Sequence, residues 1–171
     1  MDWRYDVRVA TPRDADAVSE LLRASYPRLM RSAYDEGVLA PALELMTKVN
    51  TSLLDSGTYY LAELATGFLV GCGGWTLERP GTKSAEPGLA HVRHFAVHPD
   101  WTRRGIGRTL FELCDRAARA AGVRAFECYS SLNAENFYRA LGFVRIREMD
   151  MELEPPVVLR GVLMRLDLHE A

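Results

Sequence analysis

The sequence predicts an α/β fold in which a mixed β-sheet carries helices on both faces. Three features indicate it: runs with strand periodicity near both ends, an amphipathic helix over 105–121 lying between two strands, and hairpin signals between strands. A strand–helix–strand crossover makes two strands parallel, whereas hairpins make their strands antiparallel. Because both kinds of connection occur, we expect a sheet with both strand directions.

The first 58 residues predict one strand followed by helices. Valines alternate with polar residues over 5–10, which indicates a strand. Asp14 is placed to cap a helix, and Pro27 is expected to interrupt it; the inner face of this helix carries Val18, Leu21 and Leu22. Two further helical stretches are expected, over 28–36 and 41–55.

The remaining residues alternate between strands and helices. Strands are expected over 59–65 and 68–77, joined by an Ala-Thr-Gly hairpin turn. After a loop rich in glycine, proline and polar residues, we expect a strand, a helix, a strand, a helix and two closing strands, over 89–98, 105–121, 124–130, 133–141, 143–153 and 157–168. The apolar positions change parity between Ile146 and Met149, which predicts a β-bulge near Arg147.

Composition excludes several functional classes and indicates one domain over 1–171. The chain is 48% hydrophobic and 26% charged, as ordinary globular domains are. A net charge of −2 provides no general attraction to nucleic acid or to membranes, so neither is expected as a partner. Cys72, Cys114 and Cys128 lie in apolar elements. They are expected to be reduced core residues of a cytoplasmic protein, and no metal site is expected.

Residues 95–108, FAVHPDWTRRGIGR, are the most informative segment. An apolar run stops at Pro99, and two arginines and Gly-Ile-Gly then lead into the helix. Backbone N–H groups at a helix N-terminus are unpaired, and the helix dipole adds positive potential there. Gly105 and Gly107 are expected to let the backbone approach an oxyanion closely. The turn is therefore predicted to hold a diphosphate.

Two common diphosphate loops do not fit this turn. A Walker loop needs a lysine after its second glycine, whereas the lysines of this chain are Lys48 and Lys83. A dinucleotide fingerprint needs a third glycine at the position that Leu110 occupies. Two interpretations of the turn then stay open: a glycine turn with no ligand, between a strand and a helix, or the diphosphate site of another family.

The turn resembles the acetyl-CoA signature of the GNAT N-acetyltransferases, Gln/Arg-x-x-Gly-x-Gly/Ala. Gly105 and Gly107 stand at its fixed positions, and Thr102 departs from the usual first residue, which affects one contact and not the backbone cradle. Residues 133–143, NAENFYRALGF, are similar to the second signature of the family, Asn-x4-Phe-Tyr-x3-Gly-Phe, apart from one spacer residue. The resemblance covers nearly the whole chain.

The resemblance implies a mostly antiparallel, twisted sheet of six to seven strands that splays between the fourth and fifth strands. It implies transfer of an acetyl group from acetyl-CoA to a primary amine of a small molecule or peptide, in a ternary complex and without a metal. The pantetheine arm would lie in the splay. The residues implied for cofactor binding are Phe95, Ala96, Val97, Arg103, Arg104, Gly105, Ile106, Gly107, Arg108 and Asn133. Asn133 is also expected to be a helix N-cap.

Tyr138 matches the tyrosine that protonates the departing sulfur in the family. A phenol with a pKa near 10 is a suitable donor to a thiolate whose own pKa is about 8–9. The competing interpretation is a structural tyrosine packed against Phe137.

The base that deprotonates the amine is less well defined. Strict alternation along 89–98 predicts one face with His91, Arg93, Phe95 and Val97, and an opposite face with Val92, His94, Ala96 and His98. His91 is the first choice, Glu127 competes with it, Glu63 is third, and a water chain is an alternative. His94 is expected to pack under the sheet, and His98 to be a turn residue.

The resemblance places the acceptor cleft between the first helices and the loop before the last strand. Its residues here are Tyr26, Met30, Tyr34, Trp75 and the stretch 155–161, all of which also fit ordinary core packing. Two other interpretations stay open: a non-catalytic acyl-CoA sensor, and a transferase for a longer acyl chain, which Arg93 would favour. A homodimer through the closing strands is also an open expectation.

Overall fold

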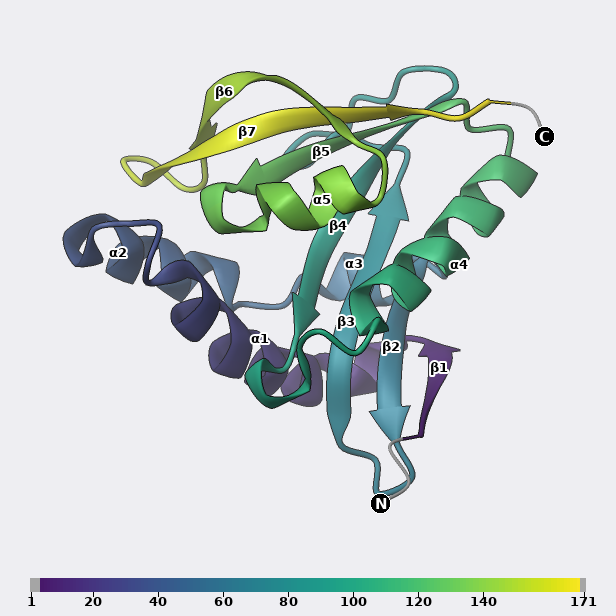
Figure 1. Ribbon diagram of the computed structural model, residues 1–171, viewed down its shortest axis with the longest axis horizontal. Coiled ribbons are helices and arrows are strands. Elements are labelled where there is room, and N and C mark those ends of the chain that lie inside the picture. Colours follow the sequence, from purple (N-terminus) through teal and green to yellow (C-terminus); the bar gives the residue numbers. More distant parts are fainter. Residues whose placement is uncertain (1–3, 170–171) are drawn as a thin grey trace.

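Seven strands form one sheet in the computed structural model, which describes residues 4–169 (Figure 1). Their order is β1-β2-β3-β4-β5-β7-β6. The strands are β1 (Tyr5–Val9), β2 (Tyr59–Leu64), β3 (Leu69–Thr76), β4 (Leu89–Val97), β5 (Ala125–Ser131), β6 (Val144–Glu152) and β7 (Val158–Asp167). All neighbouring strands are antiparallel except β4 and β5, which are parallel. The predicted mixed, mostly antiparallel sheet is confirmed.

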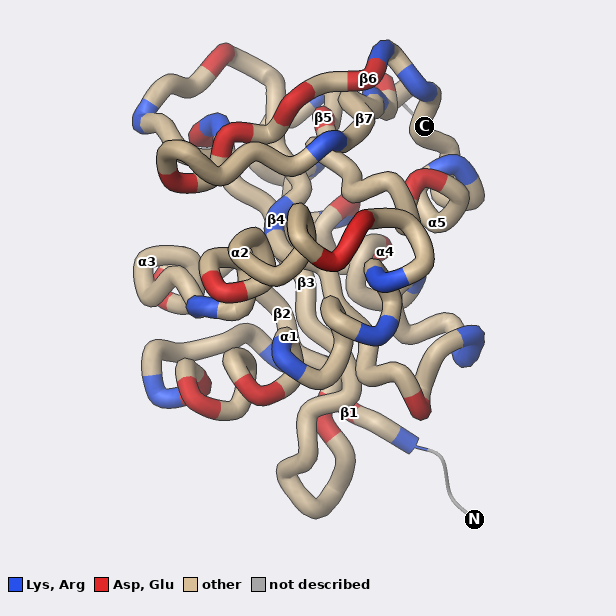
Figure 2. The backbone as a smooth tube through the Cα atoms, turned by 90° about the vertical axis from the view of Figure 1, so that its left-hand side faces the viewer, with Lys and Arg blue, Asp and Glu red and all other residues tan. Residues whose placement is uncertain are grey.

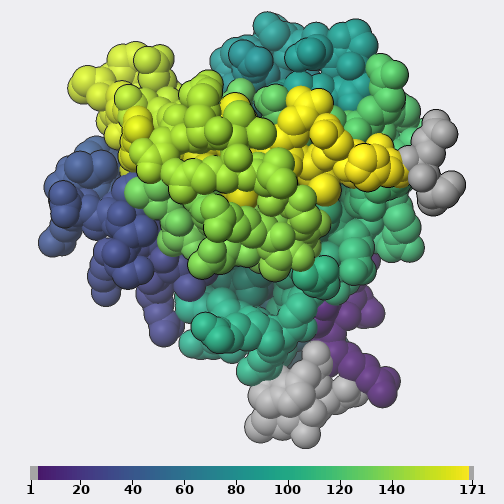
Figure 3. Space-filling model, turned by 45° about the horizontal axis from the view of Figure 1, so that its top comes forward, coloured from purple at the N-terminus to yellow at the C-terminus, as the bar shows by residue number. Residues whose placement is uncertain are grey.

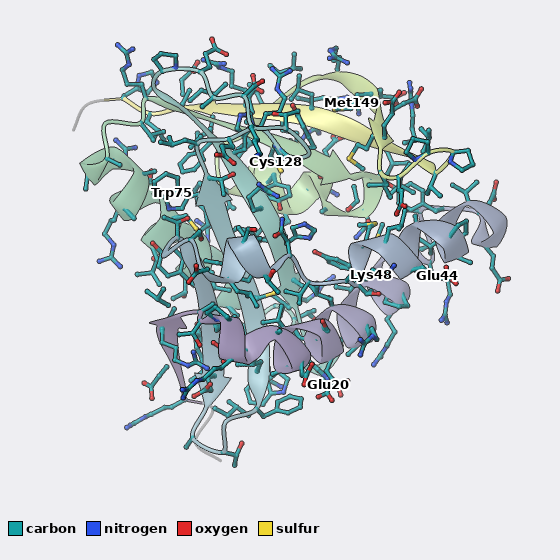
Figure 4. All side chains as sticks on the ribbon, turned by 180° about the vertical axis from the view of Figure 1, so that it is seen from behind. Glu20, Glu44, Lys48, Trp75, Cys128 and Met149 are labelled. Atoms are coloured by element: carbon teal, nitrogen blue, oxygen red, sulfur yellow. The ribbon has the colours of Figure 1, made fainter. Side chains whose placement is uncertain are left out.

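Helices cover both faces of the sheet, as Figures 1 and 4 show from opposite sides. One face carries α4 (Ile106–Ala120) and α5 (Glu135–Ala140). The other carries α1 (Ala15–Met30), α2 (Glu36–Met46) and α3 (Thr51–Leu54). Short 3-10 turns, η1 (Pro12–Asp14), η2 (Pro99–Trp101) and η3 (Leu132–Ala134), precede α1, α4 and α5. Each face has its own apolar cluster, with Leu110 and Phe126 in one and Leu22 and Leu61 in the other.

Charges of both signs are distributed over the molecule. Figure 2 shows Lys and Arg interspersed with Asp and Glu around α1 and α2 and around β6 and β7. Several of these charges form ion pairs, such as Arg160 with Glu148 at 2.8 Å and Arg8 with Asp14 at 2.7 Å. This mixed pattern accords with the small net charge of −2.

The parallel strands β4 and β5 separate after a short stretch. Their pairing covers three positions, Leu89 with Ala125, Ala90 with Phe126 and His91 with Glu127. Beyond these positions β4 continues to Val97 and β5 continues to Ser131. The separation is the splay between the fourth and fifth strands that the family resemblance implies.

A β-bulge at His94 changes which side chains share a face of β4. His94 has a left-handed backbone with φ +44, and the register with β3 shifts between Cys72 and Gly74. Val92 and Phe95 both pack on the α4 face, while Ala96 packs on the α1 face. An even-numbered and an odd-numbered residue share a face only because the bulge inserts one residue.

The predicted faces of β4 are therefore wrong. His91 and Arg93 alternate with Val92, so they lie on the α1 face, opposite Phe95 and Val97. The prediction assumed uninterrupted alternation, and a bulge inside an apolar strand leaves little trace in the sequence. The one bulge that the sequence predicted, near Arg147, is confirmed, since the pairing of β6 with β7 shifts between Arg145 and Arg147.

The helices near the N-terminus differ from the prediction in two places. Pro27 lies inside α1, which continues to Met30 and is not interrupted. Hydrogen bonds from Ser25 and Tyr26 to β4 carbonyls hold this last part of the helix against the sheet. The stretches expected over 28–36 and 41–55 are replaced by α2 and α3, because Asn50 accepts hydrogen bonds from two backbone N–H groups and starts a new helix.

Candidate active site

A cavity of about 930 Å³ opens where β4 and β5 separate. Its wall comes from the end of α1, β4, the start of α4, the end of β5, α5 and β6. Figure 3 shows α1 and α2 in purple to blue, α5 with β6 and β7 in light green to yellow, and the segment leading into α4 in teal. The cavity thus joins elements from both faces of the sheet.

The start of α4 forms one end of this cavity. Gly105 is the N-cap, in a left-handed conformation with φ +77, and Arg103 before it has φ +61. A Cβ atom on Gly105 would meet nothing within 4 Å, so this position faces open space. The first N–H groups of a helix have no intrahelical partner. The predicted turn with exposed backbone donors is therefore present, at one end of the cavity.

Gly107 has a packing role that the sequence did not predict. A Cβ atom there would lie 2.8 Å from two ring carbons of Phe137, and the residue is buried. The missing side chain lets α4 pack closely against α5, and Gly107 also lines the cavity. This contact could not be predicted from the sequence, because its partner lies 30 positions further along the chain, on another helix.

The arginines of the turn have distinct surroundings. The Arg104 guanidinium stacks over the Trp101 ring, 4.5 Å from its centroid. Arg108 donates a hydrogen bond of 3.0 Å to the carbonyl of Ala140, near the end of α5. Arg103 is exposed and lines the cavity. All three arginines thus lie near the helix N-terminus and favour an anion there.

The edge of β4 offers backbone groups to the cavity. The N–H of His98 donates to the carbonyl of Val70. Hydrogen-bonded pairs recur at every second residue of an antiparallel ladder, so Ala96 and Cys72 also form such a pair. The N–H and the carbonyl of Val97, which lies between Ala96 and His98, therefore point away from β3. The carbonyl groups of Phe95 and Val97 accept hydrogen bonds from Tyr26 and Ser25, at 3.2 and 2.8 Å. Of the three predicted residues, Ala96 thus faces β3, and Val97 presents its N–H to the splay.

Tyr138 lies in the cavity wall and is also packed among aromatic rings. Its side chain is 6% exposed, and its ring centroid is 5.0 Å from that of Phe137. Burial raises the pKa of Tyr138 well above its ordinary value, and the neighbouring Cys128 thiol raises this pKa further. The hydroxyl therefore carries its proton at neutral pH. The structural and the catalytic interpretations of this tyrosine are compatible.

Asn133 lies in the cavity wall but is not a helix N-cap. It belongs to the short turn η3, and Ala134 stands at the N-cap of α5. Helix α5 begins at Glu135, two residues after the predicted start at Asn133, because the 3-10 turn η3 precedes it.

The structure separates the candidate histidines. His91 is 2% exposed and is not among the described residues that line the cavity. Burial, with Arg79 and Arg93 nearby, lowers the pKa of His91 to about 4. His94, expected under the sheet, instead lies in the cavity wall, and burial lowers its pKa to about 4. His98 is a turn residue as predicted, since its Nδ1 accepts a hydrogen bond from Asp100 N.

The two carboxylates considered as alternative bases also lie outside the described cavity lining. Glu127 is opposite His91 in the sheet, with a carboxylate oxygen 3.6 Å from an Arg165 nitrogen. Glu63 forms an ion pair of 2.8 Å with Arg8, between β1 and β2.

The four residues predicted for the acceptor cleft separate into two groups. Tyr26 and Met30 line the cavity. Tyr34 instead donates to the carbonyl of Arg160 in β7 and accepts from the N–H of Leu132 in η3, at 2.6 and 2.8 Å. It is not among the described residues that line the cavity. Trp75 packs in the core on the α4 face, and Figure 4 shows it far from Met149 of β6.

Sequence reasoning missed several lining residues on this side. Met46, Met149 and Met151 contribute to the wall, as does Arg93, which the sequence analysis had connected with a longer acyl chain. Met149 and Met151 alternate with acidic residues on β6, so strand periodicity alone could have assigned them to one inward face. Arg93 was assigned to the wrong face, because the bulge at His94 follows it.

Comparisons with known proteins identify the family. The chain matches the family model described as "Acetyltransferase (GNAT) domain" over residues 55–145. It is 30% identical over 159 residues to an aminoglycoside N(6')-acetyltransferase type 1 of Stenotrophomonas maltophilia, a match that covers 87% of this chain and 94% of that protein.

Solved structures agree with this result. A GCN5-related N-acetyltransferase from Rhodopseudomonas palustris is 24% identical, with a TM-score of 0.74 and 96% of each chain covered. The PaiA N-acetyltransferase from Thermoplasma acidophilum, solved in complex with coenzyme A, is 14% identical, with a TM-score of 0.67 and 96% and 99% of the two chains covered. The chain belongs to the GNAT acetyltransferase family and is an acetyltransferase.

Within residues 4–169, no helix is long and apolar enough to cross a bilayer.

Proposed function

We propose that this acetyltransferase uses acetyl-CoA and acetylates a primary amine by direct attack in a ternary complex. The observation that carries the proposal is one continuous cavity, which runs from the backbone donors at Gly105, past the free edge of β4, to Tyr138 and the α1 face. A diphosphate fits the first part and an extended thiol arm the second. The complex of the PaiA enzyme with coenzyme A supports this assignment of the cosubstrate.

The reaction requires three tasks of the site. The nitrogen lone pair attacks the thioester carbonyl, negative charge develops on oxygen, and the carbon–sulfur bond breaks. The N–H of Val97 faces the splay and can donate to the developing oxyanion. Tyr138 donates its proton to the departing thiolate. The amine must lose one proton, so that the products are an amide and a thiol.

The low pKa of both histidines determines the expected pH dependence. Because the pKa values of His91 and His94 are lowered to about 4, both side chains are neutral above about pH 5 and cannot produce a rising limb near neutrality. The rise of kcat/KM with pH should instead follow deprotonation of the amine substrate, and shift when an amine of different pKa is used. His94→Asn, which tolerates the left-handed backbone, should lower kcat at every pH, because His94 lines the cavity.

The control for this prediction is His91→Ala, which should retain the limb. Profiles of both variants with two amines of different pKa test it. A limb that stays near pH 6.5 for both amines and disappears in His91→Ala would assign the base to His91, as the sequence predicted.

A panel of amines tests the proposed function. Acetyl-CoA and the enzyme are incubated with aminoglycosides, polyamines, aromatic amines, amino acids and peptides, and release of free thiol is measured. We expect thiol release that depends on at least one amine, with the N-acetylated product identified by mass. Tight binding of coenzyme A without thiol release for any amine would favour the sensor interpretation. Propionyl-CoA and succinyl-CoA in the same assay determine the acyl preference.

A further inference from the structure

Arg93 is a partly buried cation in the cavity wall that lacks a carboxylate partner among the described residues. Its guanidinium donates one hydrogen bond of 3.0 Å, from Nη1 to the Thr76 hydroxyl. Glu78 acts on Arg93 through its charge, and the ion pairs of the described residues do not include these two. A guanidinium withdrawn from water is costly unless an anion compensates it.

Other arginines of the chain are compensated by ion pairs with carboxylates. Arg8, Arg145 and Arg160 each have a carboxylate oxygen within 2.7–2.8 Å. All three are well exposed, so they need a partner less than Arg93 does. The unpaired position of Arg93 in a cavity wall therefore indicates that its anion comes from the ligand.

The charges around Arg93 reinforce this conclusion. Arg79 and Arg93 both act on His91 and help to lower its pKa, so two cations lie on this side of β4. Of the acidic residues in the wall, Asp150 is paired with Arg160 at 3.0 Å, and Glu152 is exposed. A carboxylate on the acceptor would thus find an open cation and no unpaired buried carboxylate beside it.

Four methionines give the acceptor side a large apolar surface. Met30 of α1, Met46 of α2, and Met149 and Met151 of β6 line it together with Tyr26. Figure 4 shows Met149 on β6 above the α2 side of the molecule. Thioether side chains pack well against irregular apolar groups.

We propose that the acceptor is an α-amino acid with an apolar side chain. Its carboxylate pairs with Arg93, its side chain packs among the four methionines, and its amine points toward the splay between β4 and β5. This inference rests on the proposed transferase function and specifies its substrate class.

Matched acceptors test the proposal. Leucine and leucinamide share the amine and the side chain, and only leucine has the carboxylate; serine has the carboxylate without the apolar group. We measure kcat/KM by thiol release at a pH at which both amines are largely neutral. The wild-type enzyme should prefer leucine to leucinamide and to serine, each by roughly 10-fold or more. Calorimetric titration of leucine into the CoA-loaded enzyme gives the same comparison without turnover.

Arg93→Met is the decisive variant, with Arg147→Met, an exposed β6 arginine outside the cavity lining, as its matched control. Arg93→Met should lose roughly 10- to 100-fold in kcat/KM for leucine, change less than about threefold for leucinamide, and keep the wild-type affinity for coenzyme A. Arg147→Met should leave all three values unchanged.

The outcomes separate the two proposals. Equal losses with leucine and leucinamide in Arg93→Met would show a structural role and overturn the inference. Acetylation of an aminoglycoside or another amine, with no activity on amino acids, would overturn the substrate class and leave the transferase function intact. Absence of thiol release with every amine would overturn the proposed function and the inference with it.

Discussion

Tyr138→Phe is expected to lower kcat by about 10²-fold or more, with little change in the affinity for coenzyme A. The substitution removes one hydroxyl from a ring that keeps its contacts with Phe95, Phe137 and Phe143, so the fold and the binding surface should persist. The expelled thiolate then lacks its proton donor. Because burial raises the pKa of this phenol, the donor is fully protonated throughout the neutral range, and the loss should be nearly independent of pH there.

Tyr129→Phe is the matched control for this variant. Tyr129 also lines the cavity but lies on the α1 side of β5, beside His91. Its loss should change kcat by less than about threefold, within the range of a surface hydrogen bond. An unchanged kcat in Tyr138→Phe, with thermal stability retained, would remove the acid role and leave this tyrosine as a packing residue. Steady-state kinetics and a coenzyme A titration supply both readouts.

Gly105→Asn is expected to raise the Kd for coenzyme A by about 10²-fold, which corresponds to about 2.7 kcal/mol. Asparagine tolerates the left-handed conformation with φ +77, so the backbone of the turn should be kept. Its side chain, however, enters the open space before the α4 N-terminus, where nothing lies within 4 Å of a Cβ atom. The diphosphate and this side chain cannot occupy the same place.

Gly57→Asn controls for the backbone cost. Gly57 has φ +79 and open space around its Cβ position, as Gly105 does, but it lies before β2 and outside the cavity lining. Gly57→Asn should keep the wild-type Kd for coenzyme A and show the same small change in unfolding free energy as Gly105→Asn. If both variants bind coenzyme A as the wild type does, the diphosphate does not lie at this turn.

The parts of the fold that local sequence determines could be predicted. The segment 95–108 encodes a strand end, a left-handed glycine and a helix start within a few residues, and the structure has each of them. Gly122 and Gly142 follow α4 and α5 with φ +86 and +104, as residues after a helix C-terminus do. These features depend on neighbours in the chain, so periodicity and turn chemistry suffice to find them.

The site could be predicted only in part, because it depends on contacts between distant segments. One inserted residue at His94 reversed the faces of β4, which moved His91 and Arg93 to the α1 side and brought His94 into the cavity wall. Trp75 has an aromatic side chain, as expected for an acceptor cleft, but it packs on the α4 side of the sheet. Burial of this kind becomes visible only when strand register is known.

A crystal structure with bound coenzyme A tests the central claim most directly. We predict diphosphate oxygens within hydrogen-bond distance of the backbone N–H groups of residues 105–108, the thiol arm along Val97 in the splay, and the sulfur beside the Tyr138 hydroxyl. A coenzyme A molecule bound elsewhere, with the space before Gly105 empty, would contradict the proposed site and the acid role of Tyr138 together.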